Sequence, residues 1–87
     1  MNTETLARAV ELLAAGDWQP AHKIVQRDTS ELAAWLHGIM HTLEGDLDNA
    51  QHWYRKAHRV FPGRDAVEGE IAAARSAVRD GAEPGSP

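Results

Sequence analysis

The sequence predicts an all-α fold of five antiparallel helices, arranged as two helical hairpins followed by a single C-terminal helix. Apolar residues recur at intervals of three or four along most of the chain, which is the periodicity of an amphipathic helix. No segment alternates apolar and polar residues as a half-buried strand would. Gly16, Gly45 and the pair Pro62-Gly63 stand where the periodic stretches stop. The links between these stretches are short, which favours antiparallel packing of successive helices.

The first hairpin begins with a helix expected over about Thr3–Ala15, since the glycine that follows is a natural helix stop. Its apolar face consists of Leu6, Ala9, Val10 and Leu13. The second helix begins after Asp17, an N-cap residue type. It accepts Pro20 in its first turn because amides there have no helical partner. Its apolar face consists of Trp18, Ala21, Ile24 and Val25.

The second hairpin begins with a helix that Ser30 or Thr29 caps and Gly45 ends. The main apolar stripe of this helix consists of Leu32, Leu36, Ile39 and Leu43. The fourth helix follows Asp46 as its N-cap and is expected to continue through Phe61, where a Pro-Gly pair ends it.

The fifth helix is expected to open at Asp65, because Asp65 and Glu68 have the spacing of a capping box. Its single apolar stripe consists of Val67, Ile71, Ala74 and Val78. Residues 1–80 are therefore expected to form one domain. Residues 81–87 are rich in glycine and proline and hold no apolar residue larger than alanine, which predicts a disordered tail.

Composition excludes several kinds of site. The 87 residues include no cysteine, so the chain has no disulfide, thiolate zinc site or cysteine nucleophile. The net charge of −4 argues against a nucleic-acid partner, and we interpret one cationic cluster as complementing a helix dipole. The cluster consists of Arg55, Lys56, His58, Arg59 and Arg64. The longest uncharged stretch, Leu32 to Leu43, is too short to cross a membrane. With no signal-peptide pattern at the N-terminus, the expected location is the cytoplasm.

Small and aromatic residues at fixed offsets mark the second hairpin. They are Gly38, Gly45, Asp46, Ala50, Tyr54, Ala57 and Pro62. With them, Glu31 to Arg64 resembles a tetratricopeptide repeat, a unit of about 34 residues that folds as two antiparallel helices. The first hairpin is a degraded copy that matches only at Gly16, Asp17 and Ala21. The resemblance implies two stacked hairpins, with the fifth helix as a cap.

The resemblance also implies a groove that binds a peptide or a partner protein. The matching positions here are Leu32, Trp35, Ile39, Thr42 and Leu43. The pattern departs from the family at His37 and His41, where a leucine and a tyrosine are usual, and its tryptophan is displaced by one residue. The chain is also similar to a group of small bacterial proteins without assigned function, through strings such as Trp53-Tyr54-Arg55. That similarity implies a bacterial protein but no activity.

Four polar residues suggest an alternative function. His37 and His41 are four residues apart on one helix face, and Glu44 lies three residues further on the same side. If the facing turn of the second helix brings His22 near, the four could hold zinc or another divalent metal. The competing interpretation is that each histidine is an interior or boundary residue satisfied by a hydrogen bond. We favour it because histidine pairs four residues apart are common in helices, and the glutamate that directly follows the first histidine in the zinc-protease pattern is absent.

No arrangement of serine, histidine and acid suggests catalysis, so an enzyme is not expected and no cofactor is implied. Because Trp53 and Tyr54 are adjacent on a helix, their side chains diverge by about 100°, and we expect one in the core and one partly exposed. The first helix has no recognisable cap, which predicts a homodimer through that helix or through Trp35 and Ile39. The sequence thus favours a non-catalytic protein- or peptide-binding module. Its alternative is a small metal- or ligand-binding helical bundle.

Overall fold

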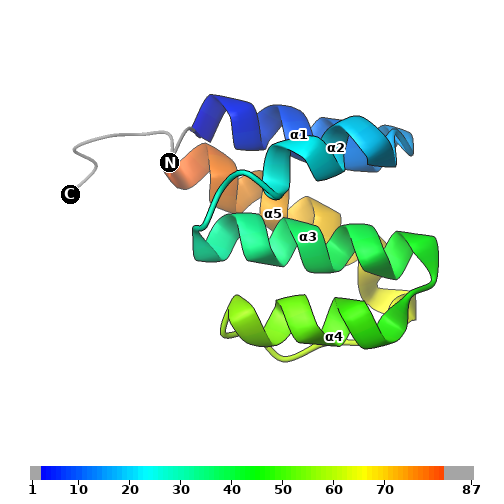
Figure 1. The fold of residues 1–87 in the computed structure, drawn as a ribbon. Helices are drawn as coiled ribbons and strands as arrows, with labels where there is room; N and C mark the ends of the chain where they lie inside the picture. The colour runs from blue at the N-terminus through cyan, green and yellow to red at the C-terminus, as the bar shows by residue number, and fades with distance from the viewer. Residues whose placement is uncertain (1–2, 82–87) are drawn as a thin grey trace.

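The computed structural model describes residues 3–81 and confirms the all-α class (Figure 1). Its elements are α1 (Thr3–Ala15), α2 (Trp18–Val25), α3 (Glu31–Glu44), α4 (Leu47–Lys56), the 3₁₀ turn η1 (Arg64–Ala66) and α5 (Val67–Gly81). This part of the chain contains no strand and no helix that is long and apolar enough to cross a bilayer. The predicted tail begins at the last residue of α5, and residues 82–87 lie outside the described range.

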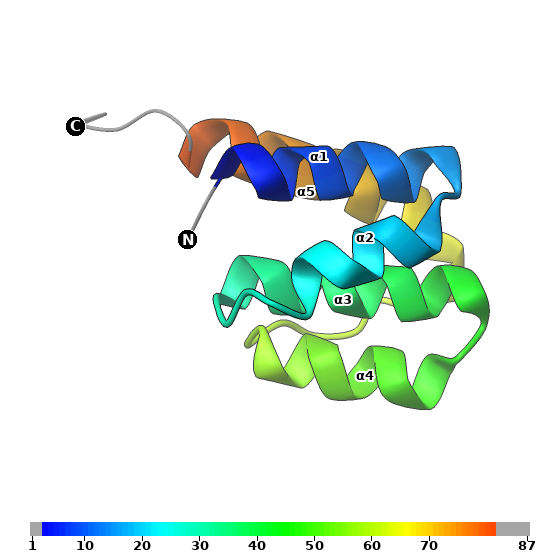
Figure 2. The same ribbon diagram turned by 45° about the horizontal axis from the view of Figure 1, so that its top comes forward.

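Helix α3 is the centre of the fold. It packs against α1, α2, α4 and α5, and it lies between α2 and α4 in both ribbon views (Figures 1 and 2). A helix that is covered on nearly all sides needs few polar residues. The run from Ala33 to Met40 is accordingly buried without interruption, and it includes the histidine at position 37.

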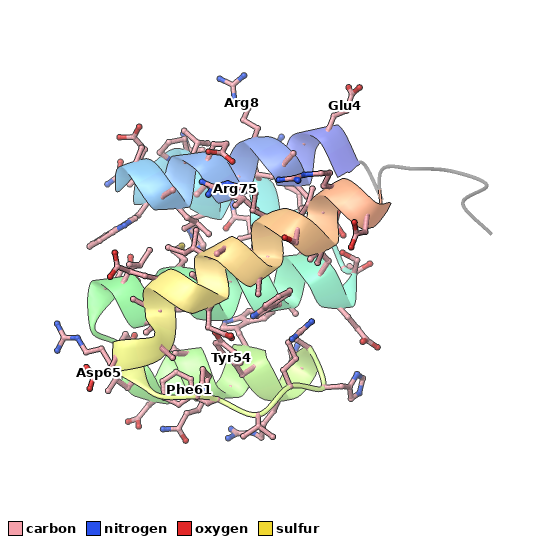
Figure 3. All side chains as sticks on the ribbon, turned by 180° about the vertical axis from the view of Figure 1, so that it is seen from behind. Glu4, Arg8, Tyr54, Phe61, Asp65 and Arg75 are labelled. Carbon is pink, nitrogen blue, oxygen red and sulfur yellow. The ribbon has the colours of Figure 1, made fainter. Side chains whose placement is uncertain are left out.

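Helix α5 closes the back of the molecule. Seen from behind, it crosses α1 and α3 (Figure 3), and it packs against both. Its stripe buries Ala74 and Val78 completely and packs Val67 and Ile71 against the core, as predicted. The apolar face of α1 is therefore covered within the chain, because Leu6, Ala9, Val10 and Leu13 are all buried. These four residues are therefore not an open face, although Val10 lines a cleft of about 360 Å³ with Val78 of α5, and the homodimer stays a prediction.

Three helices end in the same hydrogen-bonded turn. After α1 and α3, Gly16 and Gly45 adopt left-handed backbone with φ of 84°, and the Asp46 N–H donates to the carbonyl of His41. This is a Schellman motif, which strongly favours glycine at the left-handed position. After α4, His58 takes that position with φ of 59°, and the Arg59 N–H donates to the carbonyl of Tyr54 at 2.9 Å.

The predicted end of the fourth helix was therefore wrong. The helix ends at Lys56 rather than continuing through Phe61, because the turn at His58 directs the chain back along α4 and α5. Phe61 then packs edge-on against Tyr54, with ring centroids 5.3 Å apart (Figure 3). No glycine marks this turn, so the sequence carried no signal for it.

Two of the four predicted N-cap residues make the expected capping hydrogen bond. The Ser30 hydroxyl accepts a hydrogen bond from the Ala33 N–H, and Asp46 accepts one from the Asn49 N–H. Asp17 precedes α2 but makes no capping bond with its side chain. Asp65 lies inside η1 rather than at the start of α5, so the predicted capping box was wrong. A 3₁₀ turn instead leads the chain into α5.

Gly38 sets the distance between α3 and α4. A Cβ atom at this position would lie 2.6 Å from Cδ1 of Tyr54 and 3.2 Å from the carbonyl oxygen of Ala50. Two helices can approach this closely only where one contributes no side chain. The small and aromatic residues that define the repeat-like pattern thus meet at this contact, although the repeat itself stays a prediction.

Candidate binding cleft between α2, α3 and α4

Three of the five side chains of the groove predicted from the repeat resemblance are buried. Trp35, Ile39 and Thr42 are at most 2% exposed, and the Thr42 hydroxyl donates to the Gly38 carbonyl at 2.8 Å. The two remaining positions, Leu32 and Leu43, are half-buried and pack against the core. Helix α5 packs over α3, so these side chains stabilise the fold, although Leu32 and Trp35 also line a small pocket of about 210 Å³.

Trp35 shows how extensively that side of α3 contacts the rest of the fold. Its indole N–H donates to Glu70 at 3.1 Å, and the Tyr54 hydroxyl donates to the same oxygen at 2.8 Å. The guanidinium of Arg59 lies 3.4 Å from the centre of the Trp35 ring. A cation over an aromatic face is favourable, so this arginine covers the Trp35 side of the core. Burial and the bond to Glu70 raise the pKa of Tyr54, which stays protonated.

Part of the cationic cluster thus has a specific structural role. Arg59 covers Trp35, and the Lys56 ammonium lies 5.0 Å from the centre of the Trp53 ring. His58 lies 2.9 Å from a carboxylate oxygen of Glu31 on the exposed surface. These contacts add to the expected interaction with the helix end.

The histidines on the opposite side of α3 do come together with His22. The ring of His37 lies 4.9 Å from that of His22 and 5.0 Å from that of His41, measured between centroids. It also stacks on Trp53, with centroids 3.8 Å apart and planes 7° apart. Trp53 is the partly exposed member of the Trp53–Tyr54 pair and Tyr54 is the buried one, as the sequence predicted for two adjacent aromatics.

We call the cleft beside these rings the binding cleft. It lies between α2 and α4, with α3 as its floor, and has a volume of about 510 Å³. Its lining comprises His22, Val25, Gln26, Asp28, Thr29, Ser30, Ala34, His37, Trp53 and Lys56. Volumes of this size are typical of sites for small ligands and short peptide segments. Helices supply six of the ten lining residues, and the loop between α2 and α3 supplies Gln26, Asp28, Thr29 and Ser30.

His37 is the unusual residue of the binding cleft. It is 4% exposed, lies at the cleft surface and makes no hydrogen bond with any residue in the range 3–81. Burial lowers the pKa of His37 to about 4, with further contributions from His41, His22 and His52. The ring is therefore neutral at physiological pH. A neutral imidazole offers one N–H donor and one nitrogen acceptor.

The four predicted metal ligands divide into two groups. His41 Nδ1 lies 3.0 Å from a carboxylate oxygen of Glu44, as their spacing of three residues allows. Glu44 is exposed, however, and it does not line the cleft that His22 and His37 share. His37 and His41 are stacked, so their ring nitrogens lie around parallel planes instead of pointing at a common centre. Within the described range, no group of three or more such residues could hold a metal ion.

Sequence reasoning missed Trp53 and Lys56 as cleft residues. The sequence did contain a signal for Trp53, because Gly38 and Tyr54 belong to the repeat-like pattern and lie in contact where α3 packs on α4. The residues one position earlier on each helix, His37 and Trp53, then face one another in the same way. The loop residues Asp28 and Thr29 had no such signal, because their place depends on how α2 packs on α3.

The binding cleft thus combines a buried neutral imidazole, a stacked tryptophan and one lysine on a rigid helical frame. Its shape and side chains suit a ligand that is partly polar. The resemblance of Glu31 to Arg64 to a tetratricopeptide repeat stays a prediction. No protein-family model, curated protein or solved structure matches this chain.

Proposed function

We propose that this protein is a non-catalytic binding module that holds a short peptide segment of a partner protein in the binding cleft. The observation that carries the proposal is the cleft of about 510 Å³, formed by three helices and the loop between α2 and α3 and bordered by stacked aromatic rings. Half-exposed tryptophans and neighbouring polar groups are typical of the central contacts of peptide-binding surfaces.

The chemistry of the lining supports binding rather than catalysis. The Ser30 hydroxyl caps α3 through the Ala33 N–H, and Asp28 accepts a hydrogen bond from the Ser30 N–H at 2.8 Å. Neither is paired with an imidazole in the arrangement that activates a nucleophile. The polar groups of the cleft are thus placed to hold a ligand in position.

A metal site is the second candidate, because three imidazoles lie close together, although no three of the described residues are arranged to hold an ion. The test is metal analysis of protein purified without an affinity tag, before and after the double change His37→Gln and His41→Gln. Stoichiometric zinc, nickel or iron that disappears in the double variant would establish this function in place of peptide binding.

The peptide-binding proposal can be tested with a phage-displayed library of random peptides. Clones selected on the native chain are counter-screened on Lys56→Glu and Trp53→Ala. The matched control is Lys23→Glu, which reverses the charge of the chain's other lysine, an exposed residue outside the cleft lining. We expect clones that bind the native chain and the control but neither cleft variant. A selection that yields no clones, or clones insensitive to both cleft changes, would refute the proposal.

A further inference from the structure

We propose that the ligand of the binding cleft carries a carboxylate, which binds between the Lys56 ammonium and the imidazole ring of His37. The inference rests on the proposed function, because it specifies the chemistry of the peptide that the cleft would hold. It is carried by an imidazole at the cleft surface that makes no hydrogen bond within residues 3–81 and by a lysine that has no acidic partner in the same range.

The first observation is the unused hydrogen-bonding capacity of His37. The His37 side chain lines the cleft, is 4% exposed and has ring contacts but no hydrogen bond within the described chain. Its nitrogens are not among the fully buried atoms without a partner, so they can be reached from the cleft. Trp53 and His41 stack on the ring and His22 contacts it in a T-shaped arrangement, so a ligand can reach only the part of the ring edge that these three leave open. A neutral ring needs an acceptor for its N–H group, and a carboxylate oxygen is the strongest acceptor that a peptide offers.

The second observation concerns charge. Lys56 lines the same cleft, rests on the Trp53 ring at 5.0 Å and forms no ion pair with any residue between 3 and 81. Asp28 is the one acidic residue in the lining, and the Ser30 N–H donates to one of its carboxylate oxygens. A lysine that is restrained on an aromatic ring loses less side-chain freedom when it binds an anion. Lys56 therefore offers a ligand the one cationic side chain of the lining, in which Asp28 is the one opposite charge.

The start of α3 adds to this charge. Ser30 and Ala34 in the lining place the first turn of α3 at the cleft, where the helix dipole is positive. The same field disfavours a metal ion or a cationic side chain. A carboxylate would thus meet Lys56, His37 and the positive helix end together.

The inference can be tested by NMR with three short peptides and the intact chain. Ac-Ala-Glu-Ala-NH2 carries an acidic side chain, Ac-Ala-Ala-Ala carries a free C-terminal carboxylate, and Ac-Ala-Gln-Ala-NH2 carries neither. We expect one or both acidic peptides to shift the ring nitrogens of His37 and the indole N–H of Trp53. The acidic peptide that produces these shifts identifies whether the carboxylate belongs to a side chain or to a chain end. The glutamine peptide should bind at least ~10-fold more weakly than its glutamate counterpart, which is the typical contribution of a hydrogen bond to a charged group.

Two variants separate the contributions of charge and ring nitrogen. Lys56→Gln should weaken binding of the acidic peptides by roughly 10-fold or more, whereas Lys23→Gln, the matched change outside the cleft, should leave it unaltered. His37→Phe keeps a ring for the stack and removes both nitrogens, so it should also reduce binding. If the glutamine peptide binds at the cleft as well as the glutamate peptide, the carboxylate inference fails while peptide binding stands. If no peptide shifts the cleft resonances, the inference is overturned as well.

Discussion

The change Gly38→Ala tests the close contact between α3 and α4 on which the whole second hairpin depends. The added Cβ atom would lie 2.6 Å from Cδ1 and 2.9 Å from Cε1 of Tyr54, distances at which one group must move. The ring cannot move freely, because its hydroxyl bonds to Glu70 at 2.8 Å and Phe61 packs against its side. The carbonyl oxygen of Ala50 lies at 3.2 Å and belongs to the α4 backbone, which leaves no room on that side either.

Two effects oppose each other in this variant. Overpacking a well-filled contact costs about 1–3 kcal/mol, whereas replacing glycine by alanine within a helix contributes about 1 kcal/mol of stability. Because the obstructing atoms are held in place, we expect overpacking to dominate and the free energy of unfolding to fall by about 1–2 kcal/mol. For a domain of this size, that corresponds to a decrease in Tm of roughly 4–16 °C.

The matched control is Gly69→Ala in α5. A Cβ atom there meets nothing within 4 Å, so only the gain in helix propensity remains, and stability should rise by about 1 kcal/mol. Urea unfolding followed by circular dichroism measures both variants under the same conditions. If Gly38→Ala is as stable as Gly69→Ala, the close packing of α3 on α4 is not as described here.

Four further outcomes follow from the same contacts. Glu70→Ala leaves the buried donors of Trp35 and Tyr54 without an acceptor, which should lower the unfolding free energy by about 2–4 kcal/mol in urea titrations. The pKa of His37 is lowered to about 4, so between pH 6.5 and 4 the unfolded chain binds more protons than the folded chain. The native protein should lose about 2 kcal/mol from pH 7 to 5 through this residue, and His37→Phe should show a correspondingly smaller loss when the urea midpoints are compared. His58→Gly should raise Tm, because glycine adopts the left-handed backbone at φ of 59° without the cost of about 1 kcal/mol that other residues incur. Sedimentation at micromolar concentration should show a monomer, because α5 covers the apolar face of α1, and a stable dimer would contradict this account of the surface.

The comparison of the helix ends shows which local signals were sufficient. Ser30, Asp46, Gly16 and Gly45 have the expected roles, because capping bonds and left-handed turns depend on residues close in sequence. The turn at His58 uses the same geometry without the favoured residue, so it was not predictable. Its backbone is stabilised by contacts from elsewhere, since Arg59 packs on Trp35 and Phe61 packs on Tyr54.

The candidate site was likewise predictable in part. Periodicity placed His37 and His41 on one face of a helix, and the structure brings His22 to them. Periodicity could not show which faces of α3 would be covered, because that depends on where α5 packs. Placement of α5 over α3 buried Trp35 and Ile39, the predicted groove residues, and left the opposite side as the open cleft.

The sequence by itself thus determined the helical class, most helix boundaries and the apolar stripe of each helix, because these follow from interactions within a few residues. Tertiary structure alone decided three things: that α5 covers α1, that the ring of His37 stacks on Trp53, and that Lys56 shares a cleft with Asp28. Each joins residues from different helices. Such contacts depend on how whole apolar faces fit together, and that fit is a property of the folded chain rather than of any local pattern.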